Sequence, residues 1–316
     1  MRGTAVRLSL SVIVLLSPLA FGQDAHISVS RSRGLPAQRA QAAPGCSSDR
    51  RTDSKTGVLI SEVVLEGPVT IGSSELSTIK SQLAGVCVAE DDEVVEGLVR
   101  NVFADQGFAR AEVKNVTLKT SDALAVPKPV TLKADVFEGP RYKFGEIKFV
   151  DNHVFSTSKL RKAFPVKRGE SYRRSKIAGG LSEIRKLYAP RGYLDFTCVP
   201  AIQFSGGTAT LTISISEGPQ YHMGKLMVYA NKEVADRLAG EWQLREGAVF
   251  DANYPQSFAD AGHSLPREVS RSDIRLVRNC PDASVDVLVI VDQTDPKLQT
   301  APKNVPCEKS HDGLQS

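Results

Sequence analysis

The sequence predicts an α+β fold of three tandem modules, each a three-stranded mixed sheet covered by two helices. One stretch, residues 141–219, shows the order strand, helix, helix, strand, strand without a gap. Two features of this stretch recur upstream, and both are separated from their upstream copies by the same number of residues. The turn after the first strand lies at Gly67 in the upstream copy and at Asn152 in this stretch, a spacing of 152 − 67 = 85 positions. The glycine after the second helix is Gly107 in the upstream copy and Gly192 in this stretch, again a spacing of 192 − 107 = 85 positions. Equal shifts at independent landmarks indicate an internal repeat.

The N-terminus has the pattern of a cleavable export signal. Arg2 and Arg7 precede an apolar run over residues 8–21, and small residues lie at its end. This run is shorter than the roughly 20 apolar residues of a spanning helix, which favours a signal peptide over a membrane anchor. We expect residues 1–22 to be the signal peptide. Residues 23–57 lack a sustained apolar period and are expected to be a disordered basic linker.

Module one is expected over residues 58–140. Its opening strand, residues 58–65, is followed by two segments with apolar residues at helical spacing and then by two strands with a longer loop between them. The module closes with Glu138-Gly139-Pro140. The same tripeptide closes the next module at Glu217-Gly218-Pro219, 217 − 138 = 79 positions later.

Module two is expected over residues 141–219. Its first strand ends at the turn pair Asp151-Asn152, and Ser156 offers an N-cap hydroxyl for a helix that Pro165 ends. The second helix, at about residues 171–188, carries one apolar stripe, and Gly192 closes it. A hairpin follows, with strands at residues 194–204 and 208–216 around Ser205-Gly206-Gly207.

Module two resembles a known domain. Tyr142-x-Phe-Gly-x-Ile, the turn Asp151-Asn152, Leu187-Tyr188 before Gly192-Tyr193, and the closing Glu217-Gly218-Pro219 are similar to the POTRA (polypeptide-transport-associated) domain. This domain forms the periplasmic arms of outer-membrane protein assembly factors, translocation assembly proteins and two-partner secretion transporters. The resemblance implies a β-α-α-β-β fold and a periplasmic role in handling polypeptide.

Module three, residues 220–292, is a degenerate repeat. A strand near residues 225–229, a helix with Val234 and Leu238, and a last strand at residues 285–291 fit the pattern, but no Glu-Gly-Pro follows. Residues 293–316 are polar and are expected to be a disordered tail. In the families named above such an arm leads into a membrane barrel, and we expect none in this sequence.

Residue types that carry catalysis show no recognisable arrangement. The sequence contains no His-Glu-x-x-His, no Gly-x-Ser-x-Gly, no phosphate-binding loop and no Cys-x-x-Cys. The five histidines are scattered along the chain. We therefore expect a non-enzymatic protein with no cofactor and no metal site. The formal net charge of +4 is too small and dispersed to predict nucleic-acid binding.

The sequence contains five cysteines, which is an odd number for an exported chain: Cys46, Cys87, Cys198, Cys280 and Cys307. Disulfides are compatible with export, but the spacing does not define their connectivity. Cys198 shares a strand face with Phe196 and Ile202 and fits the role of a small buried apolar residue equally well.

The predicted mechanism follows from the sheet. An edge strand has unpaired amide and carbonyl groups that can bind an extended chain through main-chain hydrogen bonds, largely regardless of its sequence. The POTRA resemblance points to the first hairpin strand of module two, residues 195–204, as this edge. Pro200 removes one donor there and can instead serve to blunt the edge. The predicted polypeptide-binding residues are Asp195, Phe196, Thr197, Cys198, Val199, Ile202 and Phe204.

The sequence therefore predicts an exported, periplasmic scaffold associated with the outer membrane. Its expected partners are extended outer-membrane polypeptides, an outer-membrane barrel protein, or both. One alternative is a docking module that holds a separately encoded barrel and never contacts clients. A second alternative is a periplasmic enzyme with an unrecognised site.

Overall fold

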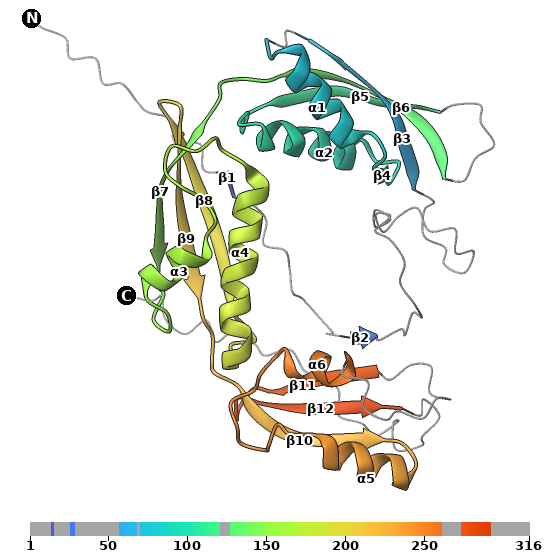
Figure 1. Ribbon diagram of the computed structural model, residues 1–316, viewed down its shortest axis with the longest axis vertical. Coiled ribbons are helices and arrows are strands. Elements are labelled where there is room, and N and C mark those ends of the chain that lie inside the picture. Colours follow the sequence, from blue (N-terminus) through green and yellow to red (C-terminus); the bar gives the residue numbers. More distant parts are fainter. Residues whose placement is uncertain are drawn as a thin grey trace, which may run out of the picture.

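Three separate sheets follow one another along the chain, with helices packed against each of them (Figure 1). The computed structural model describes residues 57–67, 70–120, 127–260 and 273–291, together with the backbone of two short strands at residues 14–15 and 26–28. Each sheet combines a parallel and an antiparallel strand pair. The predicted α+β fold of tandem modules with mixed sheets is therefore confirmed.

The first sheet, in module one, has the strand order β4-β3-β6-β5. Its second helix is capped by Asp91, the residue before its first turn. The Asp91 carboxylate accepts hydrogen bonds from the amides of Glu93 and Val94 and so satisfies donors that the helix leaves unpaired. Buried side chains at steps of four residues then face the sheet. The elements are β3 (Val58–Glu66), α1 (Ser73–Leu83), β4 (Cys87–Val88), α2 (Asp92–Asp105), β5 (Glu112–Thr120) and β6 (Lys128–Phe137).

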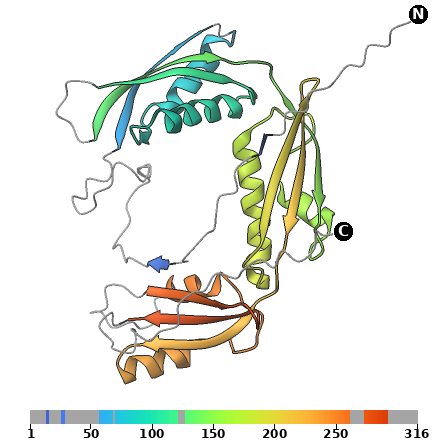
Figure 2. The same ribbon diagram turned by 180° about the vertical axis from the view of Figure 1, so that it is seen from behind.

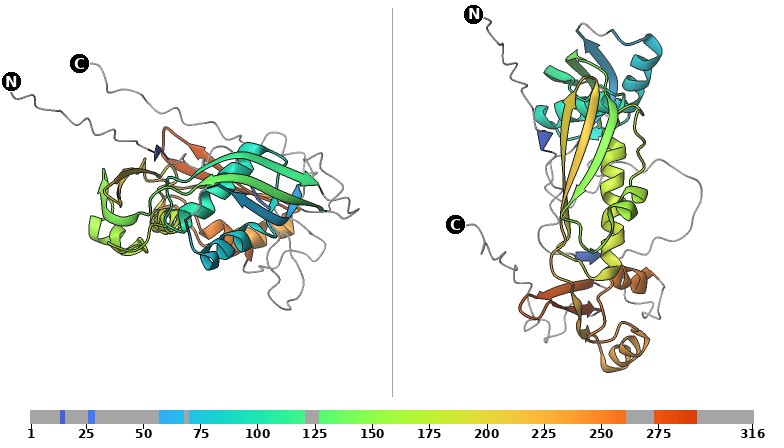
Figure 3. Two further views of the ribbon diagram at one scale, coloured as in Figure 1. Left: turned by 90° about the horizontal axis from the view of Figure 1, so that it is seen from above. Right: turned by 90° about the vertical axis from the view of Figure 1, so that its left-hand side faces the viewer.

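The second sheet, in module two, has the order β1-β8-β9-β7. The side view in Figure 3 shows α4 lying along one face of this sheet. Gly180 lets α4 approach α3 closely, since a Cβ at this position would lie 2.4 Å from the Phe164 ring. The elements are β1 (Val14–Leu15), β7 (Lys143–Val150), α3 (Thr157–Ala163), α4 (Arg174–Tyr188), the 3-10 helix η1 (Ala189–Arg191), β8 (Thr197–Ser205) and β9 (Thr208–Ser216).

The third sheet, in module three, has the order β10-β12-β11-β2. Alternate residues of its central strand are buried on the helix-covered face, and Leu288 and Ile290 are buried in a separate apolar cluster. The elements are β2 (His26–Ser28), β10 (His222–Tyr229), α5 (Lys232–Glu241), α6 (Tyr254–Asp260), β11 (Asp273–Asn279) and β12 (Ser284–Ile290).

The sheets differ from the prediction in having a fourth strand. In module one the extra strand is β4, between the two helices. In modules two and three the extra strands are β1 and β2, which fall within the predicted signal peptide and the predicted linker. Neither short segment has a periodic pattern, and each pairs through its backbone with an edge that is otherwise open. Most of these two predicted segments and the whole predicted tail lie outside the described residues.

The same backbone hydrogen bonds join each module to the next. The amide of Tyr142 donates to the carbonyl of Gly107 (2.9 Å), and the amide of Tyr221 donates to the carbonyl of Gly192 (2.8 Å). Both glycines have positive φ, and a Cβ on Gly192 would lie 2.5 Å from the carbonyl oxygen of Tyr221. Glycine is therefore required at this joint for both its conformation and its small size.

A side chain of module one also starts a helix of module two. Asp105, at the end of α2, accepts a hydrogen bond from the amide of Ser175 in the first turn of α4 (2.7 Å). Arg173, the N-cap residue of α4, makes no side-chain cap of its own. Figure 2 shows from behind that the first and third sheets lie at opposite ends of module two. Among the described residues, no helix combines the length and the apolar character needed to cross a bilayer.

Candidate polypeptide-binding edge

β8 is one of the two outer strands that module two contributes to its sheet, and β7 is the other. Its register with β9 is unbroken from the pair Thr197–Ser216 to the pair Ser205–Thr208. On its other side β8 pairs antiparallel with β1, where Val14 lies opposite Ile202 and Leu15 opposite Ala201. A short segment of the chain itself is thus added as a strand to this edge.

Side chains of β8 alternate across the sheet. Cys198, Pro200 and Ile202 are buried against the helices, whereas Val199 and Gln203 point to the opposite face and are half-buried and exposed. The unbroken ladder past Pro200 requires that its nitrogen face away from β9, because proline donates no hydrogen bond. Backbone groups at steps of two face the same side, so the amides of Cys198 and Ile202 also face the outer edge.

Two of the predicted edge residues lie outside the strand, because β8 begins at Thr197. Asp195 accepts hydrogen bonds from the Tyr221 hydroxyl and from Arg278 Nη1, both at 2.7 Å. It therefore belongs to the joint between modules two and three. Phe196 is buried, with its ring stacked on Tyr188 at 4.0 Å between centroids.

The remaining predicted residues lie on β8. Phe204 packs between the rings of Tyr142 and Tyr172, with centroid distances of 4.6 and 5.6 Å. Thr197 and Val199 are half-buried. Cys198 is a free, buried cysteine, which agrees with its predicted apolar role, and burial raises the pKa of its thiol. A buried thiol of this kind is not reactive.

Glu217 of the Glu-Gly-Pro tripeptide stabilises the C-terminal end of module two through hydrogen bonds. Its Oε1 accepts hydrogen bonds from the amides of His153 and Val154 (3.0 and 2.9 Å) and from the Tyr188 hydroxyl (2.8 Å). The pKa of Tyr188 is raised, first by burial and then by this hydrogen bond. The carboxylate thus links the end of the hairpin to the loop after β7 and to α4. Recurrence of the tripeptide was the sequence signal for this residue, but the sequence did not reveal its partners.

The tripeptide of module one makes a smaller set of contacts. Glu138 accepts hydrogen bonds from the Thr70 hydroxyl and from the amide of Ile71 (3.3 Å). It is a buried charged residue, with 7% of its surface exposed. The same residue type therefore closes both modules at the same place in the fold.

The corresponding edge of module one differs from β8, whereas that of module three resembles it. In module one the register of β5 with β6 shifts between Lys114 and Thr117, where Asn115 has a φ of 51° and donates to Asp135 Oδ2. Such a bulge disrupts the ladder and discourages strand addition. In module three β11 keeps an unbroken register with β12, and its outer side is paired with β2.

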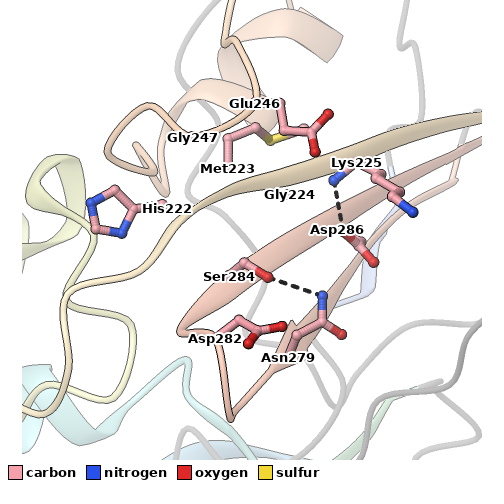
Figure 4. A pocket seen from close by; sticks show the side chains of 10 residues that line it. All are labelled: His222, Met223, Gly224, Lys225, Glu246, Gly247, Asn279, Asp282, Ser284 and Asp286. Carbon is pink, nitrogen blue, oxygen red and sulfur yellow. Dashed lines mark hydrogen bonds between the residues drawn. The ribbon is translucent and has the colours of Figure 1, made fainter.

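A shallow pocket of about 480 Å³ lies in module three, between β10, the loop after α5 and the β11–β12 turn (Figure 4). Asp286 in it accepts a hydrogen bond from the amide of Lys225 (2.6 Å), and Asn279 donates to Ser284 (3.2 Å). These polar groups stabilise the local backbone. In the described ranges, no group of histidine, cysteine and acidic side chains is arranged to hold a metal ion.

Modules one and two thus share a mixed sheet with two helices and a closing Glu-Gly-Pro tripeptide. The POTRA family model, described as "Surface antigen variable number repeat", matches residues 142–218, so module two is a POTRA domain. The chain is also 26% identical over 178 residues to a Treponema pallidum (strain Nichols) protein to which the role of an outer membrane protein assembly factor is ascribed. The match covers 55% of this chain but only 21% of that protein.

A solved structure of POTRA domains shows the same fold. POTRA domains 3–5 of Haemophilus influenzae BamA superpose with a TM-score of 0.55 at 18% identity, over 75% of this chain and 97% of that one. Haemophilus ducreyi BamA lacking POTRA domains 1–3 matches 53% of this chain and 32% of that chain, at 19% identity and a TM-score of 0.36.

Proposed function

We propose that this chain is a non-enzymatic periplasmic scaffold that binds extended polypeptide segments by strand addition at β8. The observation that carries the proposal is the antiparallel pairing of β1 with the outer side of β8. Main-chain hydrogen bonds supply the affinity in this mode of binding, so one edge accepts many sequences. The relative with an ascribed role in outer membrane protein assembly supports outer-membrane polypeptides as the ligand class.

The proposal also fits the chemistry of β8. A bound strand finds amide donors at Cys198 and Ile202 but none at Pro200, so the register of binding is restricted. Val199 and Gln203 lie on the face opposite the helices and offer side-chain contacts to every second residue of the ligand. The edge thus combines tolerance of sequence with a defined register.

A soluble strand-forming peptide, Lys-Thr-Val-Thr-Val-Thr-Val-Lys, tests the proposal by NMR on the chain from Gln23 onward. We expect amide shifts that concentrate on residues 197–205 of β8. The same peptide with alternate backbone nitrogens methylated keeps its side chains but loses its donors, and we expect it to cause no such shifts.

Matched variants of the protein complete this experiment. Val199→Lys with Gln203→Lys places two charges beside the edge and is expected to weaken binding, as lysines do on natural edge strands. Ser214→Lys places a charge on the neighbouring strand β9 and serves as the control. Shifts confined to amides outside β8, or equal binding of the methylated peptide, contradict the proposal. In that case a role in docking a partner protein is tested by crosslinking in an envelope extract.

A further inference from the structure

One segment of module two, residues 159–174, concentrates positive charge. It runs from α3 through the loop that follows it to the first residue of α4. The segment contains seven lysine and arginine residues and one acidic residue, a formal charge of 7 − 1 = +6. The whole chain has a formal net charge of +4, so the rest of it has a charge of 4 − 6 = −2. The small net charge of the chain therefore conceals one strongly basic segment.

Two of the charged side chains in this basic segment stabilise the local fold. Arg161 donates hydrogen bonds to the carbonyls of Phe164 and Val166 and so fixes the loop after α3. Glu170 accepts a hydrogen bond from Lys176 Nζ (2.8 Å), a lysine outside the segment. The one carboxylate of the segment is therefore already paired and does not neutralise the remaining cations.

The remaining cations are exposed, except for the half-buried Arg174. In the part of the chain that the structure describes, none of the exposed ones forms an ion pair or a side-chain hydrogen bond. On α2, α4 and α5, by contrast, a cation is paired with an acidic residue three or four positions away. The five exposed and unpaired cations are Lys159, Lys162, Lys167, Arg168 and Arg173.

The basic segment lies beside β7, at the other end of the sheet from β8 (Figure 1). α3 contacts both β7 and α4. The amide of Phe144 on β7 donates to the carbonyl of Glu170 (2.8 Å), and the amide of Gly169 donates to the carbonyl of Phe144 (2.7 Å). Since β9 separates β7 from β8, a partner bound to the basic segment leaves the β8 edge open.

The apolar side chains of the basic segment are not available to a partner. Leu160, Phe164 and Val166 are buried, and the large apolar side chains that are exposed among the described residues lie outside the segment. Protein–protein interfaces have an apolar core, whereas an anionic lipid surface attracts lysine and arginine by charge alone. The composition of the segment therefore favours a lipid surface over an acidic protein.

We propose that the five unpaired cations dock module two on a bilayer surface of anionic phospholipids. Their ammonium and guanidinium groups bind the phosphate oxygens of the headgroups. Each cation near such a surface adds to the affinity, and salt weakens the attraction because the cations are exposed. This docking surface is separate from the β8 edge, so the proposal does not depend on strand addition there.

Vesicle flotation tests the proposal on the chain from Gln23 onward, which lacks the apolar run of residues 8–21. We expect binding to vesicles of equal parts phosphatidylglycerol and phosphatidylcholine, no binding to phosphatidylcholine alone, and loss of binding as salt is added. Lys167→Gln with Arg168→Gln is expected to lower the affinity roughly twenty-five-fold, about fivefold for each charge removed. Both side chains are exposed in a loop, so the variant is expected to fold.

The matched control is Lys119→Gln with Arg245→Gln, which removes one exposed lysine and one exposed arginine outside the basic segment. We expect it to change the affinity by less than about twofold, because charges far from the docked surface are screened. Equal binding to both kinds of vesicle, or equal losses in the two double variants, overturns the proposal. Retention on polyglutamate beads without binding to anionic vesicles assigns the segment to an acidic protein and also overturns it.

Acetylation of lysines, read by mass spectrometry, locates the contact independently. Bound anionic vesicles are expected to protect Lys159, Lys162 and Lys167 from acetylation and to leave the exposed Lys119 of β5 reactive. Equal protection of all four lysines, or protection of none, contradicts docking through the basic segment.

Discussion

Modules one and two share a fold and a closing tripeptide but differ at the strand that ends the sheet. β8 keeps an unbroken register with its neighbour and has β1 on its outer side. β5 loses its register at Asn115, and lysines at positions 114 and 119 are exposed along it. Bulges and lysines are the means by which proteins protect sheet edges. A repeated fold therefore does not imply that the outer strands have the same capacity to pair with another strand.

The largest effect is expected from removing the glutamates that close the two modules. Glu217→Ala leaves two amides and a tyrosine hydroxyl without their acceptor, whereas Glu138→Ala leaves one amide and one hydroxyl. We expect the free energy of unfolding to fall by about 3 kcal/mol in module two and by about 2 kcal/mol in module one. Hydrogen exchange read from peptides of each module measures both values.

The control for this experiment is Glu146→Ala, an exposed glutamate of β7 whose loss is expected to change stability by less than about 0.5 kcal/mol. Equal losses in the two glutamate variants, or a loss in the control as large as in Glu217→Ala, would show that the tripeptides do not act through these hydrogen bonds.

A smaller loss of stability is expected from removing the helix cap at the joint between modules one and two. Asp105→Ala removes the acceptor for the Ser175 amide and is expected to destabilise α4 by about 1 kcal/mol, although the residue belongs to module one. Asp91→Ala removes a similar cap within module one and is expected to destabilise α2 by a similar amount. Hydrogen exchange should place the first loss in module two and the second in module one. Confinement of both losses to module one would exclude the cap between modules.

Alkaline pH is expected to destabilise module two more than module one. Burial raises the pKa of Tyr172 and of Tyr221 to about 12, and a hydrogen bond to Asp195 adds to the effect at Tyr221. A pKa that is higher in the folded state means that stability is intact below about pH 10 and falls as pH rises toward 12. Module one, residues 58–140, contains no tyrosine, so this loss should appear in module two and its joint with module three.

The measurement is the absorbance of tyrosinate at 295 nm during a pH titration. We expect a component near pH 12 that loses amplitude in Tyr172→Phe and in Tyr221→Phe. A titration in which neither variant changes the high-pH component would contradict burial of these two hydroxyls in solution.

The fold could be predicted because its signals are local and repeated. Apolar residues at steps of three and four specify α4, and glycine at positions 107 and 192 supplies the positive φ that ends each helical region. The paired strands of the hairpin were also predicted, and β9 has the predicted bounds. Such signals lie within a few residues of the structure that they specify.

The fourth strands and the role of Asp195 could not be predicted in this way. β1 and β2 are two and three residues long, too short for a periodic pattern, and they pair through backbone groups that every residue has. Asp195 contacts Tyr221 and Arg278, and Arg278 is distant in sequence. The bulge at Asn115 that distinguishes β5 from β8 likewise depends on the partner strand.

The difference between the β8 and β5 edges is tested most directly by measuring the affinity of the strand-forming peptide for the protein with and without residues 1–22. Because β1 lies in these residues, their removal leaves the outer side of β8 open. We expect the Kd of the strand-forming peptide to fall roughly tenfold on removal, as when an occupied site becomes fully available, with amide shifts on β8 and none on β5. An unchanged Kd, or shifts that appear on β5, would contradict this account.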